Sequence, residues 1–98
     1  MEKPTPHCKL SVVKALVQEG KVRVTYTATN DAAAMGCDAG GIIRTVMNLD
    51  TGDFYKSMTT YADHTIWQDV YKPSTPFGDV YLKLTVLDDV LVVSFKEL

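Results

Sequence analysis

Residues 53–81 read DFYKSMTTYADHTIWQDVYKPSTPFGDVY. The order of apolar, polar and turn-forming residues predicts a strand, a loop, a second strand, a turn and the start of a third strand. Lysine, tyrosine, glutamine and tryptophan stand where a plain sheet surface would carry threonine and serine. The stretch has no paired glutamates, no cysteine cluster and no phosphate-binding glycine loop. If it forms an active face, its acid and base must be Lys, Tyr, Gln or His. Such a set suits cleavage of RNA, whose own 2′-hydroxyl supplies the nucleophile.

The second half of the chain is predicted to be an antiparallel meander. Alternation and turn signals place its strands at residues 54–61, 66–71, 79–87 and 90–96. Asp88 and Asp89 form a tight turn, which makes the last two strands a hairpin, and residues 73–78 form a loop.

The first half is predicted to be mainly helical. Apolar residues recur at helical spacing in three segments, residues 7–19, 32–35 and 42–49. Gly20 and Gly36 are suitable stops for the first two helices, and Asn30 or Asp31 can cap the second. Residues 21–25 are β-prone but short. The two halves together predict an α+β fold.

Strict alternation sorts the last two strands into an apolar and a polar face. In residues 79–87 the aliphatic side chains share one face, and the opposite face carries Tyr81, Lys83 and Thr85. In residues 90–96 the same rule groups Leu91, Val93 and Phe95 against Ser94 and Lys96. We expect the apolar face to pack on the N-terminal helices and the other face to present Tyr81, Lys83 and Lys96.

The first two strands can add to this polar face. Phe54, Lys56 and Met58 alternate with Tyr55, Ser57 and Thr59, and Gln68, Val70 and Lys72 alternate with Trp67, Asp69 and Tyr71. Lys56 and Gln68 are therefore able to join Tyr81, Lys83 and Lys96. A solvated sheet surface is the plainer interpretation, because antiparallel sheets often expose one polar side. Similarly, His64 is either a turn residue or a catalyst, and Trp67 either stacks on a base or anchors the core.

Composition narrows the classes of protein. Ninety-eight residues with 46% hydrophobic and 22% charged residues predict one soluble globular domain, residues 1–98. No apolar run reaches the roughly 18 residues of a membrane span, and the first ten residues are too polar for a signal peptide. We therefore expect a cytoplasmic protein in which Cys8 and Cys37 remain thiols. The two cysteines have no metal-ligand spacing, and neither a metal nor another cofactor is predicted.

The net charge of −2 argues against binding to nucleic acid through bulk charge. The distribution of charge is more informative, because the acids of the second half cluster at strand ends and turns. Its lysines, by contrast, lie within predicted strands: Lys56, Lys72, Lys83 and Lys96. A local basic face is thus compatible with an acidic chain.

Four stretches carry a resemblance to a known family. They are MEK-TPH at residues 1–7, DFYKSMTTYADHTIWQDVY at 53–71, GDVYLKLTV at 78–86 and VLVVSFKEL at 90–98. The sequence closely resembles the motility quorum-sensing regulator (MqsR) family of bacterial toxins. The resemblance implies a fold like that of the RelE and YoeB toxins, in which helices pack on one face of a curved antiparallel sheet. It also implies a ribosome-independent mRNA endoribonuclease that prefers GCU-type triplets.

The resemblance assigns residues and partners as well. The family's functional residues fall on Lys56, Gln68, Tyr81 and Lys96, inside the motifs FYKS, IWQDVY, DVYLK and SFKE. We also expect Lys83, Tyr55 and Trp67 to contact the substrate. The implied partners are an mRNA substrate and a zinc-containing antitoxin that binds DNA, so that the toxin meets DNA only through the antitoxin.

The expected mechanism uses the polar face. Lysines near the scissile phosphate stabilise the charge that develops on the phosphorane oxygens. Tyr81 donates a proton or a hydrogen bond, and Gln68, which does not titrate, orients the phosphate or sugar. Lys56 is a candidate base only if Lys83 and Lys96 crowd it enough to lower its pKa; otherwise it is an electrostatic clamp. The alternative function is an inactive or weakly active RNA-binding module that binds an antitoxin.

Overall fold

The computed structural model describes residues 1–98 and has an α+β architecture with one mixed sheet. The strands are β1 (Glu2–Lys3), β2 (Val22–Val24), β3 (Phe54–Thr59), β4 (Trp67–Tyr71), β5 (Ser74–Thr75), β6 (Gly78–Val86) and β7 (Val90–Glu97). Their order in the sheet is β1-β3-β4-β6-β7-β2, and β5 pairs only with β6. The four predicted strands of the meander are confirmed, with ends that differ by one or two residues.

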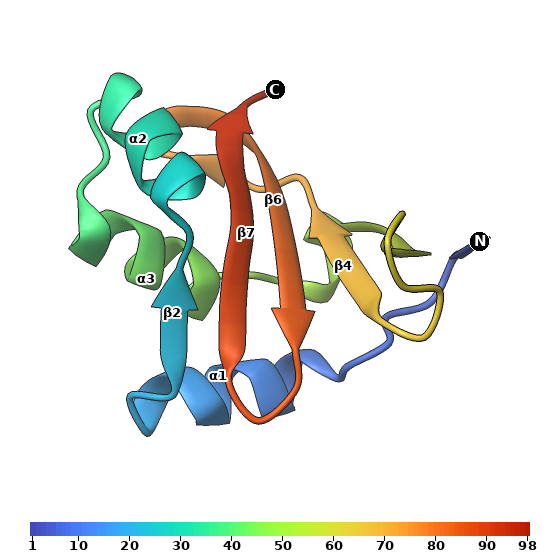
Figure 1. Cartoon of the computed structure of the whole chain (residues 1–98). Coiled ribbons are helices and arrows are strands. Elements are labelled where there is room, and N and C mark those ends of the chain that lie inside the picture. Colours follow the sequence, from blue (N-terminus) through green and yellow to red (C-terminus); the bar gives the residue numbers. More distant parts are fainter.

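Three helices cover one face of this sheet, as the sequence predicts. They are α1 (Leu10–Gln18), α2 (Tyr26–Ala34) and α3 (Ala39–Met47), and a 3-10 turn follows at Thr51–Asp53. In Figure 1 the strands β2, β7, β6 and β4 lie side by side in front of α1 and α3. None of the helices has the length and apolar character that crossing a membrane requires.

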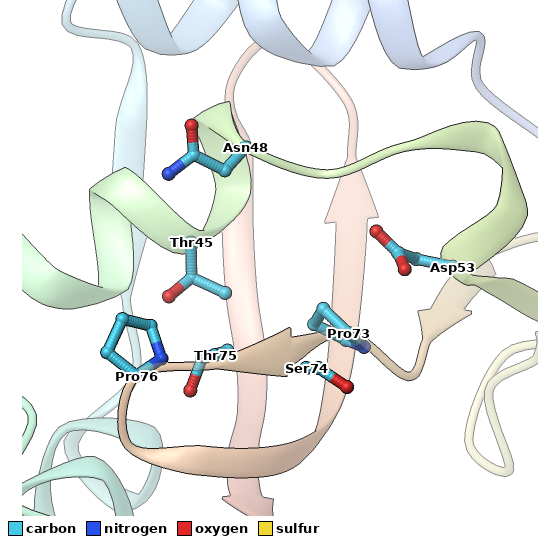
Figure 2. Close-up of a pocket in the computed structure, with 7 residues that line it drawn as sticks. All are labelled: Thr45, Asn48, Asp53, Pro73, Ser74, Thr75 and Pro76. Atoms are coloured by element: carbon cyan, nitrogen blue, oxygen red, sulfur yellow. The ribbon is translucent and has the colours of Figure 1, made fainter.

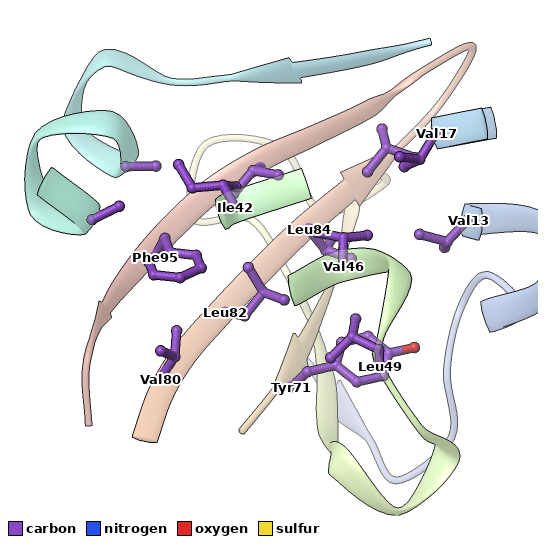
Figure 3. Close-up of a cluster of buried hydrophobic side chains, with 14 of the residues drawn as sticks. Val13, Val17, Ile42, Val46, Leu49, Tyr71, Val80, Leu82, Leu84 and Phe95 are labelled. Atoms are coloured by element: carbon purple, nitrogen blue, oxygen red, sulfur yellow. The ribbon is translucent and has the colours of Figure 1, made fainter. Parts of the chain in front are cut away.

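The core lies between the helices and the inner face of the sheet. Ile42 and Val46 of α3 meet Leu82, Leu84 and Phe95 of the central strands, all of them fully or almost fully buried (Figure 3). Each such aliphatic or aromatic side chain contributes about 1.5–3 kcal/mol when it leaves water. The sheet face that the helices cover is therefore filled by core side chains. A polar site is to be sought on the opposite face.

The helix ends differ from the prediction where polar side chains decide them. The helix α1 begins at Leu10 instead of His7, because the N–H groups of His7 and Cys8 donate to the buried Asp69 carboxylate at 2.9 and 3.0 Å and hold the chain extended. The helix α2 begins at Tyr26, because the Thr25 hydroxyl accepts from Ala28 N at 3.1 Å. The predicted cap at Asn30 or Asp31 is therefore wrong.

The N-terminal half also supplies both edges of the sheet. The two-residue strand β1 pairs antiparallel with β3, with Glu2 opposite Met58. The strand β2, which the sequence marks only as β-prone, pairs parallel with β7, with Val22 opposite Val90. The prediction of a purely antiparallel sheet is wrong at this one edge.

Two irregularities change the predicted faces. In β7 the register passes from Lys83–Ser94 to Leu84–Val92, so that Val93 is an extra residue. Val92 consequently joins Phe95 in the core, and the predicted grouping of Leu91 and Val93 with Phe95 is wrong. A similar shift between Phe54 and Lys56 leaves Phe54 on the core side, whereas Lys56 faces the other way. Such bulges cannot be read from alternation alone.

Candidate active site

Five of the predicted site residues lie together on the sheet face opposite the helices. We call Lys56, Gln68, Tyr81, Lys83 and Lys96 the lysine face. Register places Tyr81 of β6 directly opposite Lys96 of β7. Lys56 of β3, Val70 of β4 and Lys83 of β6 form a row across three strands. Gln68 stands two positions from Val70 along β4, so it lies on the same face.

Tyr81 is the centre of this arrangement. The Lys96 Nζ atom lies 5.4 Å from the centroid of the Tyr81 ring, and the Lys83 Nζ atom lies 5.9 Å from it. Both ammonium groups are attracted by the electron-rich ring. The phenol is half-buried and lies near both amines, whose positive charge would stabilise an oxyanion formed there.

Lys56 has a partner that the sequence does not predict. Its Nζ atom donates to Glu2 Oε2 at 2.7 Å, because β1 brings Glu2 beside β3 on the same face. The hydrogen bond and charge of Glu2 raise the pKa of Lys56, and the same pair lowers the pKa of Glu2. Lys56 is therefore held as a cation, and the condition under which it would serve as a base is not met.

Lys83 shows the opposite behaviour. It is partly buried in the middle of the face, and this burial lowers the pKa of its amine below the usual value. The positive charges of Lys96 and Lys56 lower the pKa of Lys83 further. Lys83 thus gives a neutral amine more readily than Lys56, whose pKa is raised.

A side chain of the neighbouring strand β6 holds Gln68 in place. The Gln68 Nε2 atom donates to Thr85 Oγ1 at 3.3 Å, which leaves the amide oxygen free to accept from a ligand. Between Lys56 and Lys83 the floor of the face is Val70, which is fully buried although it points away from the helices. The stems of the neighbouring lysines cover such a residue while their charged ends reach solvent.

Tyr55 extends the face towards the edge of the sheet. It is the extra residue of the bulge in β3, and half of its side chain is exposed. The Nζ atom of Lys72 lies 3.6 Å from the centroid of its ring, and that of Lys56 lies 5.3 Å from it. All four lysines of the second half of the chain therefore gather around two tyrosines on one surface.

Trp67 does not lie on the lysine face. Register places it with Asp69 on the helix side of the sheet, where its ring stacks on His7 at 5.6 Å between centroids. The Lys3 Nζ atom lies 4.1 Å from the Trp67 ring centroid. Of the two interpretations left open by the sequence, this placement favours the anchor over the base-stacking residue.

The remaining surface offers no comparable cluster. No group of three or more His, Cys, Asp or Glu side chains is arranged to hold a metal ion. A small pocket between α3 and β5 is lined by Thr45, Asn48, Asp53, Pro73, Ser74, Thr75 and Pro76 (Figure 2). Its one carboxylate, Asp53, already accepts from Asp50 N at 2.8 Å. The lysine face is therefore the candidate site.

Comparison with known proteins shows the family of this chain. Residues 5–97 match the family described as "Motility quorum-sensing regulator, toxin of MqsA". The chain belongs to the MqsR toxin family. A protein of Escherichia coli (strain K12) named mRNA interferase toxin MqsR is 58% identical over 97 residues, which cover 99% of each chain. The resemblance carried by the four sequence stretches is thereby confirmed.

In this member of the MqsR family, the contacts on the lysine face reveal three residues that the sequence prediction missed as part of the site: Glu2, Lys72 and Thr85. Glu2 belongs to a two-residue strand, which is too short for any periodicity to mark. Lys72 follows Gln68 and Val70 in the alternation of β4, but it is not among the predicted site residues, because no family motif marks it. The sequence placed Thr85 on the correct face, but its hydrogen bond with Gln68 is a contact between strands that the sequence does not show.

Proposed function

We propose that this chain is the toxin of a type II toxin–antitoxin system and an endoribonuclease that cleaves mRNA without a ribosome or a metal ion. The observation that carries the proposal is the lysine face, in which the Nζ atoms of Lys83 and Lys96 lie 5.9 and 5.4 Å from the centroid of the Tyr81 ring. Gln68 and Lys56 lie on the same face. The high identity to a protein named mRNA interferase supports the proposal. Residues 1–98 then act as a single toxin domain of the RelE and YoeB type, and GCU-type triplets are the proposed cleavage site.

The proposed reaction needs three transfers. The 2′-hydroxyl loses its proton to a base, and its oxygen forms a bond to the adjacent phosphorus. The bond from phosphorus to the 5′-oxygen breaks, and this oxygen takes a proton from an acid. The products are a 2′,3′-cyclic phosphate and a 5′-hydroxyl, and negative charge develops on the phosphorane oxygens in between.

The lysine face divides these tasks. Lys83, whose burial and like-charged neighbours lower its pKa, accepts the 2′-hydroxyl proton as a neutral amine. Tyr81 donates to the leaving oxygen or to the phosphate. Lys56 and Lys96 stay charged and stabilise the phosphorane, which is often the largest catalytic contribution. Gln68, fixed by Thr85, orients the phosphate or sugar with its free amide oxygen.

Tyr55 and Lys72 are proposed to follow the RNA backbone away from this centre. Tyr55 stacks on a base or sugar, and Lys72, beside its ring, contacts a phosphate. Trp67 has no part in substrate contact in this proposal, since it lies on the helix side against His7. The family description, toxin of MqsA, supports a protein antitoxin as partner. We propose that this antitoxin contains zinc and binds DNA, so that the toxin meets DNA only through it.

Single-turnover kinetics on a short single-stranded RNA test the proposal. Tyr81→Phe removes one hydroxyl and should slow cleavage by roughly 10²-fold or more, while affinity for an uncleavable 2′-deoxy RNA changes far less. Lys96→Ala should reduce both rate and affinity, because it removes a cation from the face. Lys9→Ala removes an exposed lysine at the start of α1 and is the matched control, for which neither quantity should change.

The alternative is an RNA-binding module without activity. Purified wild-type protein that binds RNA without producing a cyclic phosphate, and whose expression does not arrest growth, would establish that alternative. If Tyr81→Phe weakens binding as much as cleavage, Tyr81 is a contact residue and its catalytic role is wrong.

A further inference from the structure

A groove adjoins the lysine face at the loop between β3 and β4. Gln68 and Lys83 form its inner wall, and Met58 of β3 contributes a thioether. Tyr61 and His64, from the loop itself, line the outer part. Register places Met58 directly opposite Gln68, so the groove opens immediately beside the groups that surround the scissile phosphate in the proposed reaction.

The loop is held in place by its own hydrogen bonds. Thr60 Oγ1 donates to Asp63 O at 2.7 Å and accepts from Asp63 N at 3.0 Å. Thr65 donates to Asp63 Oδ1 from its backbone N and its hydroxyl, at 2.9 and 2.6 Å. Thr60 N also donates to Ile66 O at 2.9 Å and closes the base of the loop. Such a turn presents its remaining side chains in a fixed place.

Those remaining side chains are Tyr61 and His64. Tyr61 is fully exposed, and neither side chain takes part in the hydrogen bonds that shape the loop. An aromatic ring that contributes nothing to the core, and is carried on a rigid loop beside a cationic surface, is the arrangement on which single-stranded nucleic acids stack their bases. An imidazole next to it can donate to or accept from the edge of a base.

The charge of the groove fits the same ligand. Lys83 is its one lysine, and its other lining residues are Met1, Met58, Thr59, Thr60, Tyr61, His64 and Gln68. A phosphate is drawn to the lysine face, where four ammonium groups gather, whereas the groove offers apolar surface and neutral hydrogen-bonding groups. A nucleotide whose phosphate lies between Lys56 and Lys83 would thus extend its base towards Met58 and Tyr61.

We propose that this groove binds the nucleobase that flanks the scissile phosphate, with Tyr61 stacked on the base and His64 bonded to its edge, and that it selects the sequence that is cut. The inference rests on the proposed function, because it assigns a specificity site to that reaction. Lys83 and Gln68 connect the two sites, since each lines the groove and belongs to the lysine face.

The test uses a set of short RNAs in which the bases around one cleavage site are varied. Tyr61→Ala should raise KM on the preferred sequence by roughly 5- to 100-fold, the usual effect of losing one base–aromatic stack. Tyr61→Phe keeps the ring and should restore most of this loss. His64→Ala should flatten the preference at one base position while cleavage of the least favoured sequences changes little.

Tyr26→Ala is the matched control, because Tyr26 is also highly exposed but lies at the start of α2. It should leave KM and sequence preference unchanged. If Tyr61→Ala and His64→Ala cleave every RNA as the wild type does, while Tyr81→Phe is slow, the groove proposal is overturned and the proposed function stands. If those loop variants keep full cleavage but escape neutralisation by the antitoxin, the loop belongs to the protein partner, which also overturns the proposal. A wild-type protein that cleaves none of the RNAs defeats both.

Discussion

Lys56 and Lys83 lie in one row across the sheet, yet their neighbours move their pKa values in opposite directions. Glu2 raises the pKa of Lys56, while burial and two like charges lower that of Lys83. The sequence shows only lysines in alternating positions, and alternation says nothing about which of them is buried or paired. The residues that gather on the lysine face were predictable from motifs and alternation, whereas the opposite pKa shifts of Lys56 and Lys83 required the contacts.

The pH dependence of cleavage tests this division. A base acts when it is neutral, so the wild-type rate should rise with pH and level off above the pKa of Lys83, which lies below the ordinary value. Lys83→Arg stays charged throughout and should lose this rising limb together with most of the rate. Lys96→Ala removes a like charge, which raises the pKa of Lys83 and should move the limb to higher pH. A limb that stays in place in both variants would assign the base to another group.

The ion pair between Glu2 and Lys56 leads to a separate prediction about RNA affinity. The Glu2 carboxylate occupies the position that a phosphate would take against Lys56, at 2.7 Å. Glu2→Gln should therefore strengthen binding of an uncleavable 2′-deoxy RNA several-fold and steepen its salt dependence. Fluorescence anisotropy at several salt concentrations measures both effects. Glu19→Gln breaks a comparable exposed pair with Lys21 at the end of α1 and should change neither. Weaker binding by Glu2→Gln would show that Glu2 supports the substrate site.

Among the elements, the segment before α1 does the most to hold the site together without belonging to it. Residues 4–9 cross the helix side of the sheet and are fastened to Asp69, which accepts from His7 N, Cys8 N and the Ser57 hydroxyl. Asp69 is almost fully buried. Because β1 directly precedes this segment, the hydrogen bonds to Asp69 also help to position Glu2 beside Lys56.

Removal of the Asp69 carboxylate should therefore destabilise the fold. Asp69→Ala leaves the Cys8 N–H without its acceptor, at a cost of about 1–3 kcal/mol if water does not reach it. It also removes one acceptor each from the His7 N–H and the Ser57 hydroxyl, which keep Ser57 Oγ and Thr5 O as partners. We expect the free energy of unfolding, measured by urea denaturation, to fall by about 2–4 kcal/mol. Asp88→Ala, in the exposed turn between β6 and β7, should change it by less than about 0.5 kcal/mol. Equal effects of the two substitutions would mean that the Asp69 contacts contribute little.

The sequence predicts elements well where one long-range pattern governs them and poorly where a single side chain does. The strands of the meander follow from alternation over several residues. The start of α2 depends on one hydroxyl, that of Thr25, and the faces of β7 depend on one extra residue, Val93. Periodicity reveals neither feature. The helix start is decided by a single hydrogen bond, and the faces of β7 are decided by a one-residue shift in strand register.

At the level of the whole molecule, the net charge of −2 conceals a cationic surface. The lysines of the second half converge on Tyr55 and Tyr81, although they are spread from Lys56 to Lys96 in the chain. The fold thus gives an acidic sequence a local cationic face, which net charge alone does not reveal. Convergence of this kind follows from strand order, which composition does not contain.

Two measurements check this picture of the whole protein. Cleavage of single-stranded RNA should persist in EDTA, because the reaction is proposed to use only side chains of the lysine face. Binding of 2′-deoxy RNA should weaken with salt, with a logarithmic slope of roughly −2 to −3 if the lysines neutralise three or four phosphates. Activity that disappears with the chelator and returns with Mg²⁺ would contradict the proposed chemistry. A slope near zero would contradict the proposal that the lysines bind the phosphates of the RNA.

The parallel pairing of β2 with β7 has a consequence for synthesis of the protein. Residues 22–24 leave the ribosome well before their partners, residues 90–92. At roughly 5–20 residues per second, β2 waits several seconds for the strand that completes its edge of the sheet. The same strand β7 brings Lys96. A nascent chain therefore lacks its full cationic surface until β7 has emerged, so the proposed nuclease site is incomplete before that point.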